Sequence, residues 1–492
     1  MDFETWALIV NSIILAIVII GTGILIWRLK LGSKNKVLLF ILFIFYWMAP
    51  LMTREYTGQM HIHQGLGDGG SLLWIPLTIY GIVGLAWRPL TDVLSFKMKS
   101  RKNVIFISLA IQLATLWPMF VWPGSFACNI IQSVGTGVGA SGIGLFNLMF
   151  SEQEHKRKIF TTVSILVLPI LIAEFVTSCV EAVLCGLVPE HGASADDPSP
   201  TIYLDYLKWL WVLAIVFVVV SFVIAFFIKE DRKTLFHNLS TKEPVKNKHD
   251  HSVVLLVCMA AVCFGFVRWV LAGPSSVTQL IYIAFAFDIP LPNAVYPTYV
   301  IDEVKFFEGY LSLVFALGQL VGAIIAAAFL SRHQNKMKWI LILFGSLCWF
   351  TNLIVNMNII NVPTYFSTNL LNGLGYGLMY PVFIGIMLNK YYTDKNIITP
   401  IGLYNTSLAL GITAGSAFNN IMKGDIFDFH YSESTSHITA FDNKNTIVNG
   451  ITIGVVLLMI VLFVCSYVIH TKYPPQKGRP NIKFNTSGEM EI

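Results

Sequence analysis

Long apolar stretches separated by short polar ones run through this chain from end to end. A helix that crosses the hydrocarbon of a membrane needs about 20 consecutive, mostly apolar residues. The stretches 209–228 and 446–469 both reach that length. Helices are expected because each backbone N–H and C=O is then hydrogen-bonded within its own segment. The pattern therefore predicts an all-α integral membrane protein.

The apolar segments form two groups on either side of a charged stretch. They are predicted at 5–28, 37–58, 71–90, 103–122, 126–150, 159–187 and 206–228, and then at 253–273, 277–298, 307–330, 338–356, 363–388, 397–421 and 446–470. The resulting division is an extra N-terminal helix and loop (1–36), an N-terminal half (37–228), a linker (229–252), a C-terminal half (253–470) and a tail (471–492).

Lysine and arginine gather in alternate loops, which places those loops on the cytoplasmic side of a membrane. The intervening loops are mainly acidic. We therefore expect a multi-pass protein of the plasma membrane, surrounded by lipid, with its C-terminus in the cytoplasm. The charges permit one net crossing between Ser252 and Phe306. A twelve-helix core with one additional N-terminal helix fits them best, and twelve or fourteen helices stay open as alternatives.

Composition narrows the class of protein further. The chain is 55% hydrophobic and 12% charged, whereas soluble domains are about 25% charged. The net charge of +5 sits in short loops, so we expect no nucleic-acid partner. The seven cysteines show no CxxC spacing, and His61 with His63 is too small a set for a metal, so no metal or cofactor is expected. The sequence has no P-loop and does not predict an enzyme.

The chain is similar to itself at an offset of about 240 residues. Asn129, Gly135 and Gly137 match Asn369, Gly375 and Gly377, and segment 5–28 is paired with 253–273. Two parallel repeats joined by a charged linker resemble the architecture of the major facilitator superfamily. That resemblance implies a two-half helical bundle with a substrate site near the membrane midplane between the halves.

A motif after the segment 71–90 resembles the cytoplasmic signature of that superfamily. It reads Arg88-Pro-Leu-Thr-Asp92 and continues, in a predicted loop, to Arg101 and Lys102. Arg88 stands where the family has glycine, and the basic pair lies further along the chain. The resemblance implies that Asp92 and Arg101 form part of a conformational latch, and the alternative is an ordinary solvated loop.

The segment that begins at Asn129 resembles the fourth helix of the superfamily. Asn129 stands where proton-coupled members have arginine, which argues against proton symport. The glycines Gly135, Gly137 and Gly139 allow close packing of neighbouring helices.

Ionisable residues inside apolar segments are costly and are candidates for function. Three stand out, namely Arg54, Glu174 and Arg268. Guanidinium groups bind phosphate or carboxylate through two hydrogen bonds and keep their charge, so an arginine from each half suits an oxyanion. Glu174 could neutralise one arginine in the absence of substrate. The alternatives are interfacial pairing for Arg54, snorkelling for Arg268 and a structural contact for Glu174.

Short patches resemble the organophosphate:phosphate antiporters, a subfamily that exchanges glycerol phosphate or hexose phosphate for phosphate. The patches are Ile79-Tyr80-Gly81, Val267-Arg268-Trp269 and Pro297-Thr298-Tyr299. About twenty extra residues between the last two patches depart from the subfamily pattern. The resemblance implies that Arg54 and Arg268 bind the anion, while Glu174, Tyr80, Asn369 and Asn405 are the further polar contacts that we predict for the substrate.

The sequence thus predicts a monomeric secondary transporter that works by alternating access. Its favoured substrate is a small organic anion, such as a sugar phosphate or glycerol phosphate, exchanged for phosphate. Two alternatives stay open, a facilitator or ion-coupled symporter of a neutral or cationic solute, and a non-transporting receptor on the same fold.

Overall fold

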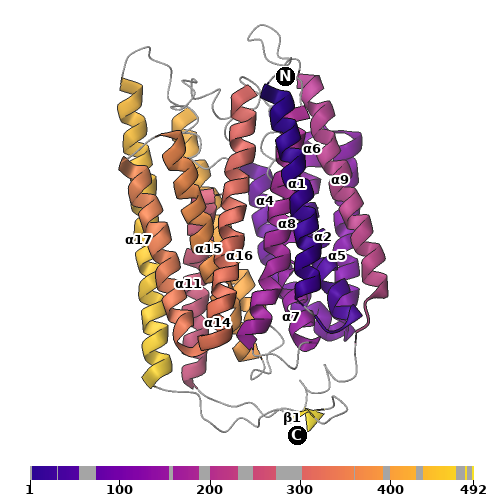
Figure 1. Ribbon diagram of the computed structural model, residues 1–492, viewed down its shortest axis with the longest axis vertical. Coiled ribbons are helices and arrows are strands. Elements are labelled where there is room, and N and C mark those ends of the chain that lie inside the picture. The colour runs from indigo at the N-terminus through magenta and orange to yellow at the C-terminus, as the bar shows by residue number, and fades with distance from the viewer. Residues whose placement is uncertain are drawn as a thin grey trace.

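The computed structural model describes most of the chain as helices that run along one axis (Figure 1). The described residues are 3–29, 31–54, 74–153, 159–187, 200–230, 248–272, 302–358, 361–391, 399–427, 436–472, 483–484 and 490–491. The segment predicted at 277–298, the residues His61, His63 and Pro297–Tyr299, and most of the linker and tail lie outside them.

The helices of the first half of the chain precede the linker. They are α1 (Phe3–Arg28), α2 (Lys34–Arg54), α4 (Trp74–Met98), α5 (Arg101–Val121), α6 (Phe126–Ala140), α7 (Ile143–Gln153), α8 (Ile159–Leu187) and α9 (Pro200–Phe227). The helices of the second half are α11 (Lys248–Ala272), α14 (Asp302–Asn358), α15 (Val362–Tyr391), α16 (Pro400–Phe427) and α17 (Ser436–Lys472). Two short antiparallel strands, β1 (Lys483–Phe484) and β2 (Met490–Glu491), follow in the tail.

Helix α14 supplies two crossings because it doubles back on itself. Gly318 lies against Leu370 and Gly373 of α15, and Gly345 lies against Gly375 and Met379 of the same helix. Twenty-seven residues of straight helix would separate Gly318 from Gly345 by about 40 Å. Both can meet one short part of α15 only if α14 reverses direction, which agrees with its two apolar spans, Tyr310–Leu330 and Met337–Asn358.

Counting α6 with α7 as one crossing and α14 as two, thirteen lengths of helix run along the bundle within the described residues. Ten are long and apolar enough to cross a membrane. Helices α2 to α9 and helices α11 to α17 make six crossings each, and α1 is additional. This is the predicted all-α, two-half bundle of about twelve core helices plus one extra, and the fold class is confirmed.

The repeat pairing of segment 5–28 with 253–273 is wrong. Arg54, the last residue of α2, lies beside Trp269 near the end of α11, so these two helices run in the same direction. Helix α1 runs the opposite way, because it connects to the start of α2 through a short turn. The structural counterpart of α11 is therefore α2, and α1 lies outside the repeat.

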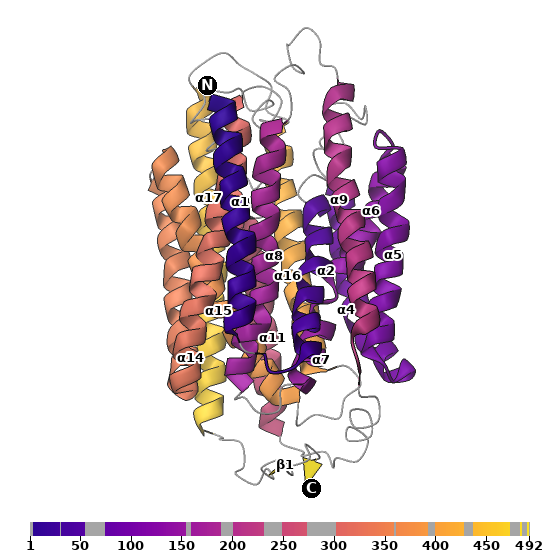
Figure 2. The same cartoon turned by 45° about the vertical axis from the view of Figure 1, so that its right-hand side comes forward.

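One end of the bundle carries the basic ends of the helices, and we call it the basic end. Arg28, Lys34, Lys97, Arg101 and Lys472 stand at the ends of helices there. The N-terminus lies at the opposite end, and the chain finishes near the basic end (Figures 1 and 2).

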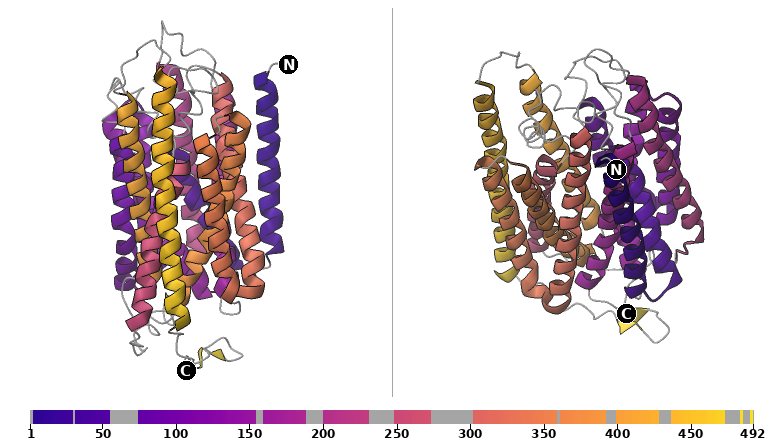
Figure 3. Two further views of the ribbon diagram at one scale, coloured as in Figure 1. Left: turned by 90° about the vertical axis from the view of Figure 1, so that its left-hand side faces the viewer. Right: turned by 45° about the horizontal axis from the view of Figure 1, so that its top comes forward.

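Helix α1 lies at the outer edge of the bundle, as the left view of Figure 3 shows. It packs against α8. Trp6, Ile13, Ile20 and other apolar side chains of α1 face outward and are exposed. A helix with this surface fits contact with lipid. The polar residue Asn11 of α1 is buried and lies within hydrogen-bonding reach of Tyr310 on α14. Helix α1 thus contacts both halves.

The two halves meet chiefly where α4 packs against α16 and where α8 packs against α14 and α15, and we call the contacts between the halves the seam. Helices α4 and α16 carry buried polar residues, among them Arg88, Asp92, Asn405 and Asn419. Neither helix is among the ten most membrane-like spans. This is expected for helices that face each other across the bundle interior rather than facing lipid.

Backbone-to-backbone contact between α14 and α15 predicts a strict requirement for glycine. A Cβ atom at Gly377 would collide with the carbonyl oxygen of Gln319, which has no flexible side chain to move aside. Gly377→Ala should therefore lower the free energy of unfolding by about 1–3 kcal/mol, the usual cost of overpacking. Thermal unfolding in detergent measures it. Gly454→Ala on α17 is the matched control, since nothing lies within 4 Å of a Cβ at that position. Equal melting temperatures for both variants would contradict the prediction.

Candidate substrate site between the halves

Arg268 on α11 lies among groups from both halves of the bundle. It is buried, at 8% exposed. Its Nη2 lies 3.8 Å from Oε1 of Glu174 on α8. Its guanidinium carbon lies 4.3 Å from the ring centre of Phe315 and 5.3 Å from that of Tyr376. The ion pair joins α8 of the first half to α11 of the second.

Arg54 approaches the same turn of α11 from the other side. Its guanidinium carbon lies 5.3 Å from the ring centre of Trp269, the residue that follows Arg268. Tyr80 on α4 stacks near the same ring, with 6.3 Å between centroids and 23° between planes. The structure thus gathers Arg54, Tyr80, Glu174 and Arg268 around two consecutive residues of one helix. We call these four residues, with Trp269, Phe315 and Tyr376, the arginine cluster.

A chain of buried polar side chains lies next to Arg54. Thr53 and Thr136 are 3.1 Å apart through their hydroxyl oxygens. The Thr136 hydroxyl lies 2.9 Å from the carbonyl oxygen of Gln132, and the Gln132 amide donates to Asn129 at 3.1 Å. Asn129 is thus held within α6. These bonds fix the end of α2 against α6.

The charges of the arginine cluster suit an anionic ligand. The seven residues of the cluster include two guanidinium groups and one carboxylate, so their formal charges sum to +1. The Arg268–Glu174 separation of 3.8 Å is an attraction but exceeds hydrogen-bond length. An incoming oxyanion can replace Glu174 at Arg268 and accept two charge-assisted hydrogen bonds. The aromatic faces around it exclude water and strengthen such bonds.

The structure places the two predicted asparagines differently. Asn369 donates to the carbonyl oxygen of Leu311 at 3.0 Å, one helical turn from Phe315. Asn405 lies on α16 beside Arg88 of α4, because its carbonyl oxygen accepts from the Arg88 guanidinium. Arg88 is eight residues beyond Tyr80, about 12 Å along α4. Asn405 therefore lies nearer the basic end than Tyr80, although Arg88 is close enough to Tyr80 and Tyr376 for their charges to interact.

Of the four aromatic members of the cluster, the sequence predicts only Tyr80 as a contact to substrate. Trp269 belongs to the short patch Val267-Arg268-Trp269, and nothing in the sequence pattern predicts Phe315 or Tyr376. Aromatic residues are so frequent in this chain, at 13%, that their type alone carries no signal. Their position next to Arg268 or in the glycine-rich part of α15 could have pointed to two of them.

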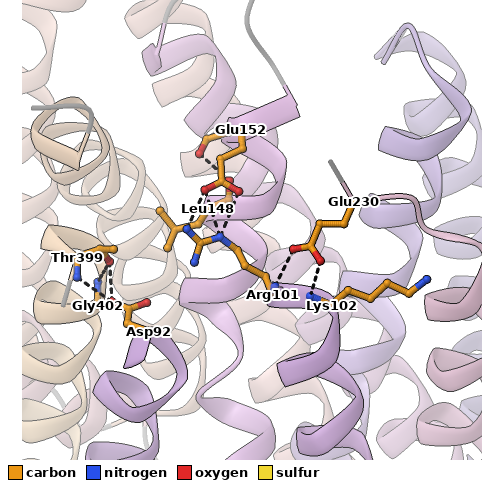
Figure 4. Close-up of polar contacts among 9 residues, drawn as sticks. Asp92, Arg101, Lys102, Leu148, Glu152, Glu230, Thr399 and Gly402 are labelled. Carbon is orange, nitrogen blue, oxygen red and sulfur yellow. Dashed lines mark hydrogen bonds and ion pairs between the residues drawn. The ribbon is translucent and has the colours of Figure 1, made fainter. Parts of the chain in front are cut away.

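Asp92 binds across the seam. Its Oδ2 accepts from the backbone N–H of Thr399 at 2.9 Å and from the Thr399 hydroxyl at 2.8 Å (Figure 4). Thr399 itself precedes α16, and its hydroxyl accepts from the N–H of Gly402 at 2.9 Å. The carboxylate of Asp92 thus stabilises the start of a helix in the other half, where the helix dipole favours negative charge.

The predicted loop around Asp92 is wrong. Arg88 and Asp92 lie within α4, which continues to Met98 with Pro89 inside it. The cause is packing: the residues 88 to 95 are needed as a helical face against α16, and this outweighs the single hydrogen bond that Pro89 cannot donate. Because it is held on a helix, Asp92 has a fixed direction toward Thr399.

Arg101 contacts a different acidic residue. It binds Glu152 of α7 through Nε and Nη2, at distances of 2.8–3.1 Å. Glu230, which follows α9, accepts from the backbone N–H of Arg101 and from Ser100, both at 2.7 Å (Figure 4). These contacts fasten α5, α7 and the chain after α9 together within the first half. Of the two predicted latch residues, Asp92 binds Thr399 in the second half, whereas Arg101 binds Glu152 in the first.

Comparison with known proteins places the fold. No protein-family model and no curated protein matches the sequence. Among solved structures, the human organic anion transporter MFSD10 (TETRAN) is similar, with a TM-score of 0.53 and 12% identity. The similarity covers 87% of this chain and 100% of that one. At this identity the likeness shows the fold, which is a major facilitator-like bundle of two helical halves.

The Asp92–Thr399 contact predicts that loss of the carboxylate loosens the seam at the basic end. Asp92→Asn should favour states open at that end by about 1 kcal/mol, the worth of a helix-capping contact. A cysteine at position 405, in a protein lacking the native cysteines, should then react several times faster with a membrane-impermeant thiol reagent. Glu230→Gln makes the same chemical change at the start of α5, inside one half. If both variants speed labelling equally, the latch assignment fails.

Proposed function

We propose that this protein is a secondary transporter that moves a small organic anion between its two halves by alternating access. The support comes from the major facilitator-like fold and from the arginine cluster, which draws residues from both halves. A binding group contributed by both halves makes substrate binding sensitive to their relative position. The single observation that carries the proposal is the Arg268–Glu174 pair across the seam.

A phosphorylated organic anion, such as glycerol phosphate or a sugar phosphate, is the favoured substrate, with phosphate as the exchanged ion. The planar donors of Arg268 and Arg54 match phosphate oxygens. The aromatic rings of Tyr80, Trp269 and Tyr376 offer apolar faces to the organic part. The similar structure MFSD10 is described as an organic anion transporter, which agrees with an anionic substrate. Exchange for phosphate follows from the resemblance to the organophosphate antiporters.

The proposed setting is the plasma membrane, with the basic end and the C-terminus in the cytoplasm. The concentration of lysine and arginine at one end supports this orientation. A monomer is proposed, since each half supplies its own share of the arginine cluster within one chain.

One observation favours a neutral or cationic substrate instead. Glu174 lies in the arginine cluster with aromatic faces around it, and a carboxylate beside aromatic rings also suits an organic cation. In that case Arg268 would serve to hold Glu174 in place, and its own charge would not bind substrate.

Replacement of Arg268 separates these proposals. In vesicles loaded with phosphate, Arg268→Gln should raise the KM for labelled glycerol phosphate or hexose phosphate at least about 30-fold, because a buried charged hydrogen-bond partner is lost. Arg28→Gln is the matched control. Arg28 is exposed, 5.4 Å from the ring centre of Trp27, and should leave uptake unchanged. Unchanged anion uptake in Arg268→Gln, or uptake of only neutral or cationic solutes by the native protein, would remove the anion proposal.

Replacement of Glu174 should have the opposite effect on affinity. Glu174→Gln removes the carboxylate that competes with the substrate for Arg268, so the KM for the anion should fall several-fold. The maximal rate should fall as well, because the empty site then keeps an uncompensated charge. Initial rates of uptake over a range of substrate concentrations measure both quantities. A raised KM would show that Glu174 contacts the substrate or fixes Arg268, and does not compete.

A further inference from the structure

Arg88 is a buried cation at the seam whose charge the arginine cluster and the latch do not use. It lies near the middle of α4 and is 4% exposed. Its Nη1 donates to the carbonyl oxygen of Asn405 on α16, and its Nη2 makes a long contact of 3.5 Å with the carbonyl oxygen of Ala140. Its Nε has no hydrogen-bond partner among the described residues. Among the described residues, two carbonyl oxygens are the hydrogen-bond acceptors that compensate this charge.

The acidic side chains of the latch region bind other groups. Asp92 lies one helical turn further along α4 and binds Thr399. Glu152 is held by Arg101. Within the part of the chain that the structure describes, Arg88 forms no ion pair. A buried guanidinium without a carboxylate costs several kcal/mol, unless a negative group reaches it during the working cycle.

Further donors without partners belong to the turn of α16 that Arg88 contacts. Asn405 is 1% exposed, and neither its side-chain nitrogen nor its side-chain oxygen has a partner among the described residues. The hydroxyl of the fully buried Tyr404, the preceding residue, also has none there. Tyr404 lies close enough to Arg88 to interact with its charge. Arg88 Nε, the Asn405 amide and the Tyr404 hydroxyl are thus three donors without partners around this contact between α4 and α16, and donors of this kind suit an oxyanion.

The place of these donors in the bundle gives them a role in transport. They lie between the arginine cluster and the Asp92–Thr399 contact, about 12 Å along α4 from Tyr80. Arg88 belongs to the first half, whereas Asn405 and Tyr404 belong to the second. Parting of α4 and α16 at the basic end would expose all three to the solution on that side.

We propose that Arg88, with Asn405 and Tyr404, is a second oxyanion-binding site, which the transported anion occupies when the bundle is open at the basic end. This inference rests on the proposed anion transport and adds a second binding position on the transport path. An anion that accepts from Nη1 of Arg88 replaces the Asn405 carbonyl oxygen. Binding from the basic side therefore removes a bond across the seam and favours the open state. The ligand class is phosphate or a carboxylate.

The KM for inorganic phosphate, measured separately at the two ends of the protein in exchange assays, tests the proposal. Arg88→Gln should raise the KM for phosphate at the basic end about tenfold or more, the worth of a charge-assisted hydrogen bond, while the KM at the opposite end stays within about twofold. Arg88→Lys should restore part of the affinity, because it keeps the charge. Asn405→Ala should raise the same KM about threefold. The control Arg28→Gln, also at the basic end, should change neither value.

A purely structural role for Arg88 predicts another result. In that case Arg88→Gln and Arg88→Lys would both lower the maximal rate from either side and leave the two KM values unchanged, which would overturn the proposal. The native protein could exchange phosphate in a way that depends on Arg268, while Arg88→Gln keeps the native KM values at both ends. That result would overturn this inference alone. Absence of any anion exchange in the native protein overturns the proposed function instead.

Binding of inorganic phosphate to the purified protein tests the proposal without a transport assay. Arg268→Gln should retain weak phosphate binding by calorimetry, and the double variant Arg268→Gln/Arg88→Gln should lose it. Equal phosphate binding by the single and double variants would refute a site at Arg88. Glycerol phosphate in place of phosphate then shows whether the site accepts an esterified anion.

Discussion

Hydrocarbon offers no partner to a charge, so each charged group inside this bundle depends on groups from neighbouring helices. Arg268 meets this constraint with Glu174, and Asp92 meets it with the start of α16. Both contacts join the two halves. The groups that satisfy buried charge are therefore also the groups that hold one arrangement of the halves, and any rearrangement has to supply new partners.

Much of the fold could be predicted from the sequence because spanning a membrane imposes a length and a polarity on each segment. The segments at 307–330 and 338–356 correspond to the two arms of α14, and the extra N-terminal helix is present. The pairing of 5–28 with 253–273 failed because the offset was set by residues later in each half, and the order of segments does not show the direction in which α1 runs. The loop predicted around Asp92 failed because the contact with α16, against which this part of α4 packs, is not visible in the local sequence.

The candidate site was predictable where a residue type is unusual for its surroundings. Arg54, Glu174 and Arg268 are ionisable groups in apolar segments, and the structure brings them together with Tyr80. Asn405 could not be placed from the sequence, because one helical turn decides whether a side chain faces the arginine cluster or Arg88. Arg88 itself was noted only as a departure from a family pattern. Its buried position and its few partners depend on α16, which is more than 300 residues away.

The contact between α14 and α15 has a mechanical consequence. At Gly318, Gly373 and Gly377 the two helices touch through their main chains, with no side chains between them. Side chains in a helix interface can absorb a small displacement by changing rotamer, but main-chain atoms cannot. The two helices therefore move together as one rigid unit. A displacement at Phe315 or Tyr376, beside Arg268, is transmitted along the second half with little loss to local rearrangement.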